Sequence, residues 1–589
     1  MSSNLRVMMT TEGTYPFHLG GVSTWCDALT KGVPAVDFIL YAILMNPFVT
    51  QKFRTSPNVK ELIKVPLWGT EEPSEHLTHI PFSSVYLAKR RTGEAVIRSD
   101  FVPLFEGLVR QLTADEGRSV PAVARTLFEM YKYFRQYDYQ TTFKSPSVWE
   151  TFKRVTLEEV GRLGRRDTIP TLFDLTESLG WLYRFFTILN TPLPKVHVTH
   201  SAAAAFCGIP CVISKLENKT PYLLSEHGIY LREQYIGTAR MRLSMYSRRF
   251  LLNLVTTVAQ LSYEFADQVS PVCQFNTRWE RRMGVPEGRI RVVYNGVDPG
   301  IYAPAPDKAQ VRRPPTVVCV ARIDPIKDME TLIRTAALVR QAVPGVKFVV
   351  YGAPSSQSYF ERCYKLRSEL ALDEVFIFAG HTNDVAAAFR TADVVALSSI
   401  SEGFPYSVVE AMMSGKPIVA TDVGGVREAV EGCGFVVPPR SPDKMATALV
   451  KLLDDEQLRA ALGKRAREKS LESFTIARLV SEYLDSYVRL HEGALRRSAA
   501  ASRNRQALFT ERGLAFMEAE MWLEAVEQFR RAVDANPSSP AVPVILTEIA
   551  QAYNSMGRVD LALVELQKAE IHAEMVLGLT SPLERAANG

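Results

Sequence analysis

The sequence predicts an α/β protein with two lobes that face each other across a cleft, followed by an all-helical tail. Three observations support this prediction. Short apolar strands alternate with helical segments from residue 316 to about residue 431, a pattern typical of a doubly wound parallel sheet. A strand, a glycine turn and a helix start also open the chain near Leu5. Beyond residue 506, a repeat of small and aromatic residues indicates paired helices.

The composition is that of an ordinary globular protein. At about 100–200 residues per domain, 589 residues predict three to five units. The 69 basic and 64 acidic residues leave a formal charge of +5 spread along the chain, so nucleic acid is not expected as a partner. The seven scattered cysteines contain no C-x-x-C pair, which favours neither a disulfide framework nor a zinc site.

The expected location is cytoplasmic. The N-terminus has no basic and apolar secretion signal, and no apolar run approaches the roughly 20 residues of a membrane span. Peripheral docking at the inner face of the membrane is compatible with this expectation.

The first lobe is predicted to cover residues 1–298. A strand at Leu5–Met9, a turn and a helix from about Ser23 form a Rossmann-type unit, in which Gly20 and Gly21 would let the backbone approach a phosphate or sugar closely. The alternative is that the paired glycine only makes a tight turn. Residues 101–189 are predicted to be an inserted helical layer, whose aromatic stripe is expected in its core; the stripe is Phe128, Tyr131, Tyr133 and Phe134.

The first lobe contains three histidines at or near predicted strand ends that are candidate functional residues. His197 and His200 form H-x-x-H, but they fall on opposite faces of a strand and have no third ligand near them, so a metal site is not favoured. His227 follows an apolar strand and is the best candidate for a functional histidine. A histidine that merely caps the strand end is the alternative.

A proline-rich linker at residues 299–315 leads into a second lobe at residues 316–472. In a doubly wound sheet, ligands bind beyond the carboxyl ends of the strands. Polar and glycine residues gather at the predicted strand ends of this lobe, which indicates a ligand site. They are Arg322, Lys327, Gly352, His381, Glu402, Gly424 and Gly425.

The most informative stretch runs from Ser398 to Gly425. A turn at Glu402 to Pro405 follows a buried strand and opens a helix, with Pro405 expected at its first position. The free amides at Tyr406, Ser407 and Val408 would hold an anion. Glu402 and Glu410 would lie roughly two helical turns apart or less, so both could face one elongated polar ligand such as a sugar nucleotide.

Glu402, Glu410 and the following AMMSGKPIVAT, together with Arg322 and Lys327, resemble the retaining nucleotide-sugar glycosyltransferases of family 4, which have the GT-B fold. The blocks EGTYP, GGVS and EHGIYLRE, which begin at residues 12, 20 and 226, resemble the PelF branch of exopolysaccharide synthesis. This resemblance implies two Rossmann-like lobes, UDP-glucose as donor substrate and no cofactor or metal. It further implies transfer of a hexose, with retention of configuration, onto a growing polysaccharide or glycan.

The resemblance also assigns roles. Arg322 and Lys327 would grip the donor diphosphate, and Glu410 would accept hydrogen bonds from the ribose. Glu402, with Gly403, Phe404, Pro405, Tyr406 and Ser407 after it, would orient the donor sugar. Gly20 and Gly21 would close on the phosphates, and His227 would lie beside the reacting sugar. The stretch Ser399-Ile400-Ser401 departs from the usual family pattern, which leaves the choice of donor open.

The tail begins with a helix at residues 473–490 that is expected to cross back to the first lobe, and a linker is predicted at residues 491–506. Residues 507–577 resemble two tetratricopeptide units, fewer than the roughly three that an independent solenoid needs, so they are expected to pack on the enzyme or to bind a protein partner or a membrane synthase complex. A plain helical extension is the alternative. The repeat pairs Gly513, Ala515, Phe516, Ala525, Phe529 and Ala532 with Ala550, Ala552, Tyr553, Ala562, Leu566 and Ala569, each 37 positions later.

Two other functions compete with glycosyl transfer. The first is a non-catalytic scaffold that senses a sugar nucleotide and recruits partners through its repeat tail. The second is an epimerase or phosphorylase of similar fold. A phosphorylase would need a pyridoxal lysine, for which the sequence has no context, and an epimerase would explain neither the insert nor the tail.

Overall fold

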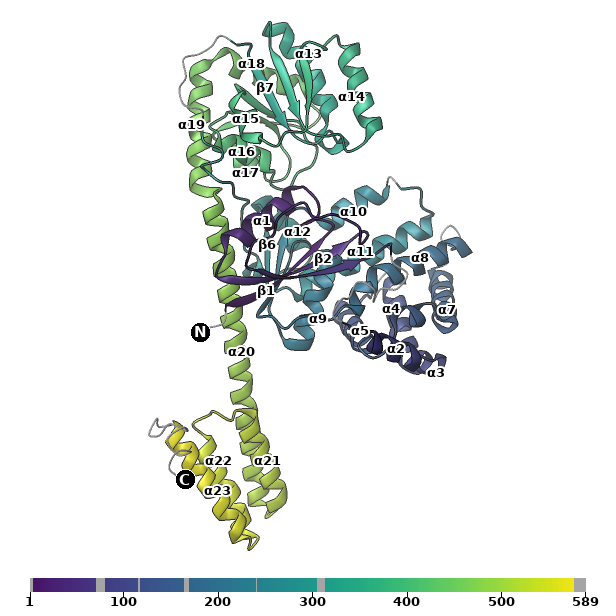
Figure 1. Cartoon of the computed structure of the whole chain (residues 1–589), viewed down its shortest axis with the longest axis vertical. Helices are drawn as coiled ribbons and strands as arrows, with labels where there is room; N and C mark the ends of the chain where they lie inside the picture. Colours follow the sequence, from purple (N-terminus) through teal and green to yellow (C-terminus); the bar gives the residue numbers. More distant parts are fainter. Residues whose placement is uncertain are drawn as a thin grey trace. The chain divides into compact units, whose positions relative to one another are not determined.

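The computed structural model describes residues 4–69, 80–114, 117–163, 169–239, 241–304 and 313–576. The chain divides into two compact units, Met1–Leu490 and His491–Gly589. The first unit contains two lobes, each built on a six-stranded sheet (Figure 1). The linker predicted at residues 299–315 lies partly outside the described residues, which omit 305–312.

The sheet of the first lobe has the strand order β3-β2-β1-β4-β5-β6, and all of its strands are parallel. The order reverses between β1 and β4, so the topological switch point lies there. The strands are β1 (Leu5–Glu12), β2 (Val36–Leu44), β3 (Val59–Pro66), β4 (Val198–Ser201), β5 (Tyr222–Glu226) and β6 (Gln268–Pro271).

The second sheet repeats this plan with the order β12-β11-β10-β7-β8-β9, and its switch point lies between β7 and β10. Its strands are also parallel, and their largely buried apolar runs are typical of a sheet covered on both faces. They are β7 (Thr316–Val320), β8 (Lys347–Tyr351), β9 (Phe376–Gly380), β10 (Val394–Leu397), β11 (Ile418–Thr421) and β12 (Gly434–Val437). The predicted pair of lobes with parallel sheets is confirmed.

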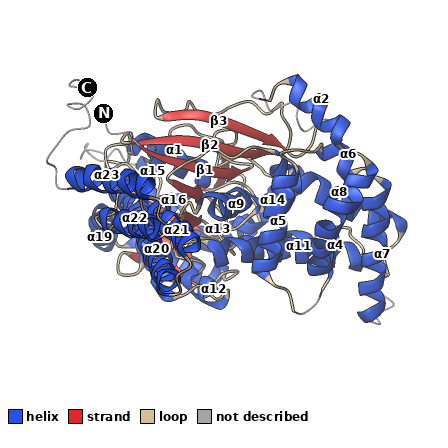
Figure 2. Ribbon diagram, turned by 90° about the horizontal axis from the view of Figure 1, so that it is seen from below, coloured by secondary structure: helices blue, strands red, loops and turns tan. Residues whose placement is uncertain are grey.

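The predicted helical insert is also present. Figures 1 and 2 show its helices gathered at one side of the first sheet. They are α2 (Phe82–Arg91), α3 (Glu94–Val96), α4 (Val102–Thr113), α5 (Val120–Tyr133), α6 (Tyr139–Phe143), α7 (Pro146–Leu163) and α8 (Leu172–Phe185). The remaining helices of the first lobe are α1 (Gly21–Gly32), α9 (Ile209–Asn218), α10 (Tyr230–Ala239), α11 (Met245–Phe265) and α12 (Thr277–Arg282).

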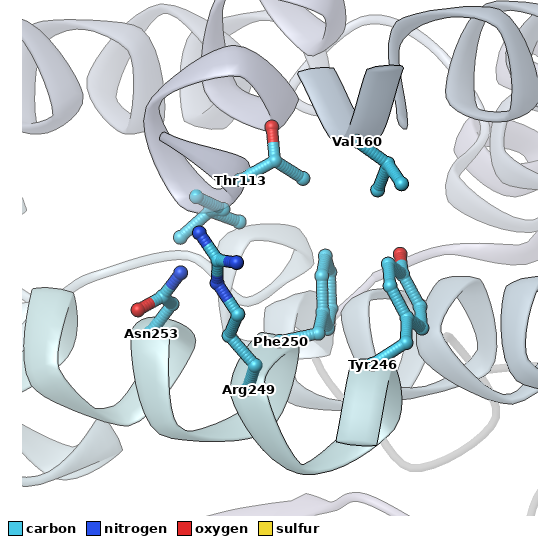
Figure 3. Close-up of a pocket in the computed structure, with 7 residues that line it drawn as sticks. Thr113, Val160, Tyr246, Arg249, Phe250 and Asn253 are labelled. Atoms are coloured by element: carbon cyan, nitrogen blue, oxygen red, sulfur yellow. The ribbon is translucent and has the colours of Figure 1, made fainter. Parts of the chain in front are cut away.

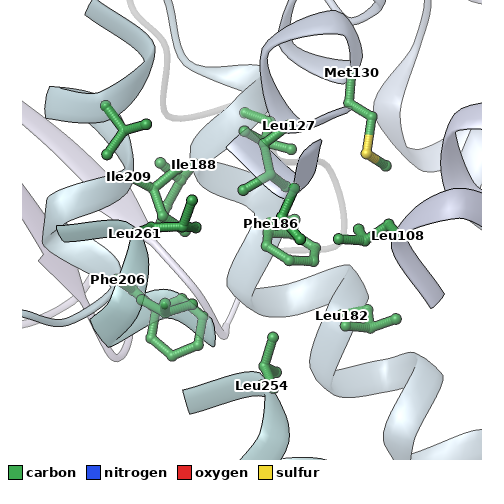
Figure 4. Close-up of a cluster of buried hydrophobic side chains, with 14 of the residues drawn as sticks. Leu108, Leu127, Met130, Leu182, Phe186, Ile188, Phe206, Ile209, Leu254 and Leu261 are labelled. Carbon is green, nitrogen blue, oxygen red and sulfur yellow. The ribbon is translucent and has the colours of Figure 1, made fainter. Parts of the chain in front are cut away.

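One continuous core joins the insert to the first sheet. Leu108, Leu127 and Leu182 from the insert pack in the same buried cluster as Ile209 on α9 and Leu254 on α11 (Figure 4). The aromatic stripe is core as predicted: Tyr131, Tyr133 and Phe134 are buried, and Phe128 packs against them partly exposed. The insert is therefore an extension of the first lobe and shares its core.

Helices cover the second sheet between its strands. They are α13 (Met329–Ala342), α14 (Gln357–Glu369), α15 (Val385–Arg390), α16 (Tyr406–Met413), α17 (Val426–Val430), α18 (Pro442–Asp454) and α19 (Glu456–Ser473). Asp328 begins α13 by accepting a hydrogen bond from the amide of Thr331. The sequence interpretation stopped at about residue 431 and did not include β12, α18 or α19.

Helix α20 (Ile476–Glu518) corrects the prediction for the tail. Its first turns pack on the first lobe, where Leu479, Tyr483 and Tyr487 join a buried cluster around β1 and β4. Residues 491–506, predicted as a linker, continue the same helix. This run is rich in alanine and arginine and contains no proline, so its intrinsic preference is helical although its polarity suggested a linker.

The second unit is all-helical, as predicted. After the end of α20 it contains α21 (Trp522–Ala535), α22 (Val542–Ser555) and α23 (Val559–Val576). A side chain at Gly513 would overlap the ring of Phe529, so the repeat pattern of small and aromatic residues marks a close helix contact. Residue 577, the last of the predicted repeat, lies outside the described residues.

Candidate functional site

The loop after β7 carries the two cations that the sequence singled out. Asp324 fixes the loop by accepting a hydrogen bond from the amide of Ile326, with an N–O distance of 2.9 Å. The Arg322 side chain is exposed and makes no hydrogen bond or ion pair with any described residue. Lys327 ends a short 3-10 turn in the same loop. Both cations thus follow β7, one of the two strands that border the switch point.

Lys327 reaches the other strand of the switch point. Its Nζ atom lies 2.6 Å from Oε1 of Glu402, which follows β10. Ser399 donates its hydroxyl to the same carboxylate oxygen at 2.6 Å, and Ser398 donates to the Lys327 carbonyl at 2.8 Å. The Lys327 and Glu402 side chains are 18 % and 9 % exposed. The ion pair is therefore largely removed from water, where charges interact more strongly than at the surface.

Two glycines bring the loop that follows Glu402 against its neighbours. Gly403 lies so close to His227 of the first lobe that a side chain there would overlap the His227 carbonyl oxygen. Gly424 has a φ of 57° and leaves no room for a side chain beside the Glu402 carbonyl oxygen. The amide of Gly425 donates to the Gly403 carbonyl at 2.7 Å. These contacts fix the turn that presents Glu402.

The start of α16 corrects the sequence prediction by one residue. Pro405 is extended and caps the helix, so Tyr406 is the first helical residue. The amide of Val408 donates to the Pro405 carbonyl, which leaves the amides of Tyr406 and Ser407 without a bond to any described residue. This helix start offers two free donors, not three.

Glu410 lies on α16, and its Oε1 accepts a hydrogen bond from the hydroxyl of Tyr302 at 2.8 Å. Burial raises the pKa of Glu410 from 4.5 to about 7, although the Tyr302 hydrogen bond acts in the opposite direction. Sequence reasoning missed Tyr302, because it falls in the proline-rich stretch interpreted as a linker. The pair places a carboxyl group and a hydroxyl group beside the helix start.

The two lobes meet at Gly21 and Tyr406. Gly20 caps α1, and a methyl group placed on Gly21 would lie 3.5 Å from the Tyr406 ring. Tyr406 is partly buried and packs against the buried clusters of both lobes. Asn295 donates its side-chain amide to the Phe404 carbonyl at 2.9 Å, which adds a second contact between the lobes. The glycine pair predicted for the first lobe therefore lies next to the helix start predicted for the second.

His227 follows β5, and its ring packs edge-on against Trp25 with the centroids 4.5 Å apart. Burial lowers the pKa of His227 to about 3, so the ring is neutral at physiological pH. Its Nε2 atom is buried and has no hydrogen-bond partner among the described residues. An unpaired buried nitrogen is costly, which makes this atom a candidate for contact with a ligand.

A hydrogen-bonded chain that the sequence did not predict lies behind His227. His200 bonds through Nδ1 to the Tyr487 hydroxyl and through Nε2 to the Ser225 hydroxyl, both at 2.8 Å. Ser225 also bonds to the Tyr483 hydroxyl at 2.7 Å. Trp25 contacts both His200 and Tyr483, so this buried chain connects α20 with the ring that supports His227.

His197 does not share a ligand with His200, because its Nδ1 accepts from the Arg6 amide. Among the described residues, no group of three or more histidine, cysteine, aspartate or glutamate side chains could hold a metal ion.

Comparisons with known proteins divide the chain in the same way as the fold. Residues 5–288 match the family model "Domain of unknown function (DUF3492)". Residues 305–469 match the model "Glycosyl transferases group 1". The match to a glycosyltransferase model thus falls on the second lobe. The charged switch point described above falls within this matched segment.

Curated relatives resemble the same part of the chain. A D-inositol 3-phosphate glycosyltransferase of Kineococcus radiotolerans is 33% identical over 225 residues, which are 33% of this chain and 52% of the relative. A trehalose synthase of Pyrococcus horikoshii is 31% identical over 180 residues, 29% of this chain and 43% of the relative. The chain thus spans about half the length of the curated relatives that it matches, or less.

Solved structures match both lobes. A sucrose-phosphate synthase from Thermosynechococcus elongatus has a TM-score of 0.53 at 18% identity, with 83% of this chain and 100% of that chain covered. HepE of Anabaena in complex with UDP-glucose has a TM-score of 0.51 at 15% identity, with 82% and 100% covered. These likenesses establish the fold, which is GT-B as the resemblance implied.

Proposed function

We propose that this protein is a retaining glycosyltransferase that moves a hexose, glucose from UDP-glucose, onto a growing polysaccharide or glycan acceptor. The observation that carries this proposal is the pairing of Lys327 after β7 with Glu402 after β10, at the switch point where doubly wound sheets bind their ligands. Arg322 lies exposed in the same loop as Lys327. This arrangement suits an anionic group joined to a polyhydroxyl group.

In this proposal Arg322 and Lys327 hold the donor diphosphate, because two cations can neutralise it without a metal. The amides of Tyr406 and Ser407 at the start of α16 add donors to the same anion. Glu410 accepts hydrogen bonds from the ribose hydroxyls in place of the one from Tyr302. Glu402 orients the hexose, and Gly20 and Gly21 let the first lobe approach the phosphates.

The proposed reaction breaks the bond between the sugar C1 and the diphosphate oxygen. An acceptor hydroxyl attacks C1 from the face that the diphosphate leaves, and its proton passes to the departing phosphate oxygen, so the configuration is retained. Arg322 and Lys327 stabilise the charge that develops on the leaving group. The neutral ring of His227 contacts the reacting sugar through Nε2, the atom without a partner.

The finer parts of the proposal are a PelF-like role in exopolysaccharide synthesis and the choice of UDP-glucose. The blocks that begin at Glu12 and Glu226 support the first, since they resemble that branch. HepE, which shares the fold, holds UDP-glucose in its structure, and this supports the second.

We also propose that residues 507–577 form tetratricopeptide-like repeats that bind a protein partner or a membrane synthase complex. Apolar side chains on the last helix are exposed, among them Leu563 and Ile571. None of the described helices is both long and apolar enough to cross a bilayer. We propose that such a partner would hold the chain at the inner face of the membrane.

The test is donor turnover with a panel of UDP-, GDP- and ADP-sugars, followed by NMR of the anomeric proton in the product. The proposal predicts glucose transfer from UDP-glucose with retention. A thermal-shift panel of the same donors separates this outcome from the alternatives, because a ligand stabilises the chain by mass action. Binding without turnover would favour the sensing scaffold, and inversion would contradict the retaining mechanism.

A further inference from the structure

Two cavities formed by described residues border the helices of the insert and differ in size. The smaller one lies between Thr113, Val160, Tyr246, Arg249 and Phe250 and has a volume of about 20 Å³ (Figure 3). That volume is enough for about one water molecule. Such a space is a packing gap and not a site for an organic ligand.

The larger cavity has a volume of about 360 Å³ and opens on the insert. It lies between the segment that joins α6 to α7 and the middle of α8. Volumes of about 300–1,000 Å³ are typical of sites for small organic ligands. The cavity is lined by Phe143, Lys144, Ser145, Trp149, Thr176, Leu179, Gly180 and Tyr183.

We propose that this larger cavity, here called the insert cavity, is a second carbohydrate site that binds a sugar ring carrying a negative charge. It would hold part of a glycan chain on the insert, away from the switch point of the second lobe. The carbohydrate class rests on the proposed function, because a glycan is the acceptor and product that this enzyme would handle.

The aromatic lining supports a ring-shaped ligand. Trp149 and Tyr183 are both partly exposed at the insert cavity, and Phe143 is buried beneath it. Flat aromatic faces suit a ligand that presents apolar C–H groups on one side and polar groups at its edge. The Trp149 indole N–H makes no hydrogen bond with any described residue, so it can donate to such an edge.

The charge of the lining supports an anionic ligand. Lys144 lies with its ammonium 5.8 Å from the centre of the Tyr183 ring and forms no ion pair with any described residue. No carboxylate is among the residues that line the cavity. The other polar groups of the lining are the hydroxyls of Ser145, Thr176 and Tyr183, of which that of Thr176 already donates within α8. The lining therefore offers one positive charge and several donors, which suit carboxylate and hydroxyl oxygens.

Gly180 keeps the cavity open. It lies within α8, and a methyl group placed there would meet no other atom within 4 Å. Glycine weakens a helix interior, and no close contact of the helix requires it at this position. A larger side chain at residue 180 would fill the cavity without removing any contact that now exists.

The test is calorimetric binding of tetragalacturonate, an acidic tetrasaccharide, to the full chain. Maltotetraose serves as the neutral sugar, and a tetrapeptide containing tryptophan and aspartate represents a protein partner. We expect tetragalacturonate to bind more tightly than maltotetraose and the peptide not to bind. Equal binding of the two sugars, binding of the peptide alone, or no binding of either sugar would overturn the inference.

Variants locate the binding. Trp149→Ala and Gly180→Gln should each weaken tetragalacturonate binding about tenfold or more, which corresponds to about 1.4 kcal/mol. Lys144→Gln should remove the preference for the acidic sugar but leave binding of the neutral sugar unchanged. Lys132→Gln is the matched control, because Lys132 also lies over an aromatic ring, that of Phe128, but does not line the cavity. Unchanged binding in Gly180→Gln would overturn the inference even if Trp149→Ala misfolded.

Donor turnover with a short acceptor separates this inference from the proposed function. If the insert cavity is a second site, Gly180→Gln should keep turnover with a monosaccharide acceptor at the wild-type rate. Turnover without any oligosaccharide binding would overturn the second site and leave the proposed function in place. Oligosaccharide binding at the insert without turnover would support the second site and contradict the enzyme.

Discussion

The two lobes share one strand order but carry different side chains along and beyond their strands. In the second lobe, charged groups follow β7 and β10, and Lys327 and Glu402 form an ion pair there. In the first lobe, β1 and β5 end in the buried carboxyl groups of Glu12 and Glu226, whose pKa values are raised by burial. His200 on β4 is bonded to Ser225 and Tyr487. The difference shows that one strand order can carry an ion pair in one lobe and a buried, hydrogen-bonded imidazole in the other.

Loss of a cation from the second lobe should have the largest effect. Lys327→Ala removes one charge from the proposed diphosphate site and leaves Glu402 without its ion pair. We expect kcat/KM for UDP-glucose to fall about 10²–10³-fold, as for the loss of one preorganised charge-stabilising group. Lys365→Ala is the control, because that lysine is 79 % exposed. A wild-type rate in Lys327→Ala would contradict a role of this site of the second lobe in the reaction.

The next effect concerns stability and pH. Burial raises the pKa of Glu410 from 4.5 to about 7. Between these two values the unfolded chain loses the Glu410 proton and the folded chain keeps it, so wild-type stability falls as pH rises. The loss amounts to about 3 kcal/mol and is complete above pH 7.

Glu410→Gln should remove this dependence, because glutamine does not titrate and can still accept from Tyr302. In thermal unfolding from pH 5 to pH 8, the stability of the variant relative to the wild type should increase as pH rises. Glu468→Gln, at a position 61 % exposed, should show no such trend. A constant difference between Glu410→Gln and wild type would contradict the raised pKa.

In the first lobe, the effect of a single hydroxyl should be smaller. Tyr487→Phe leaves Nδ1 of buried His200 without its partner, which costs about 1–3 kcal/mol in unfolding free energy. Because His200 stays neutral, this loss should not depend on pH between 6 and 8. Denaturant unfolding at both pH values checks the prediction, and a loss that varied with pH would show that His200 carries charge.

The smallest effect is expected at His227. The bond from His227 to the sugar would be a neutral hydrogen bond, which contributes about 1 kcal/mol. Because asparagine can still donate or accept a hydrogen bond, His227→Asn should lower kcat/KM only about five- to tenfold. The ratio of variant to wild type should stay constant from pH 5.5 to pH 8, since the pKa of His227 is about 3. A ratio that changed near pH 6.5 would identify His227 as a titrating group.

The sequence predicts those elements whose bounds are determined by a local pattern of residues. The alternation predicts a helix at residues 329–342 and a strand at Lys347–Tyr351, and α13 and β8 have these bounds, because period, length and capping residues all agree in that region. Arg322, Lys327 and Glu402 follow recognisable strands and Glu410 lies on a recognisable helix, so the sequence indicates their positions, and their roles stay predictions. Pro405 was misplaced by one residue, since a proline suits both the cap and the first helical position.

Contacts between distant segments could not be predicted in this way. The bond from His200 to Tyr487 joins residues 287 positions apart, and nothing in either local sequence indicates the other. Tyr302 was hidden in a proline-rich stretch, and its role depends on how the chain returns to α16. The polar run at 491–506 was interpreted as a linker, because polarity alone does not distinguish an exposed helix from a loop.

The most direct test of the central claim is calorimetric titration of UDP-glucose into wild type and Arg322→Ala. The exposed Arg322 side chain makes no hydrogen bond or ion pair with any described residue, so its loss should leave the fold intact and report on the ligand. The account predicts binding at one site in the wild type and affinity weakened about tenfold or more in the variant. Equal affinity in the two proteins would contradict a diphosphate site at the switch point of the second lobe.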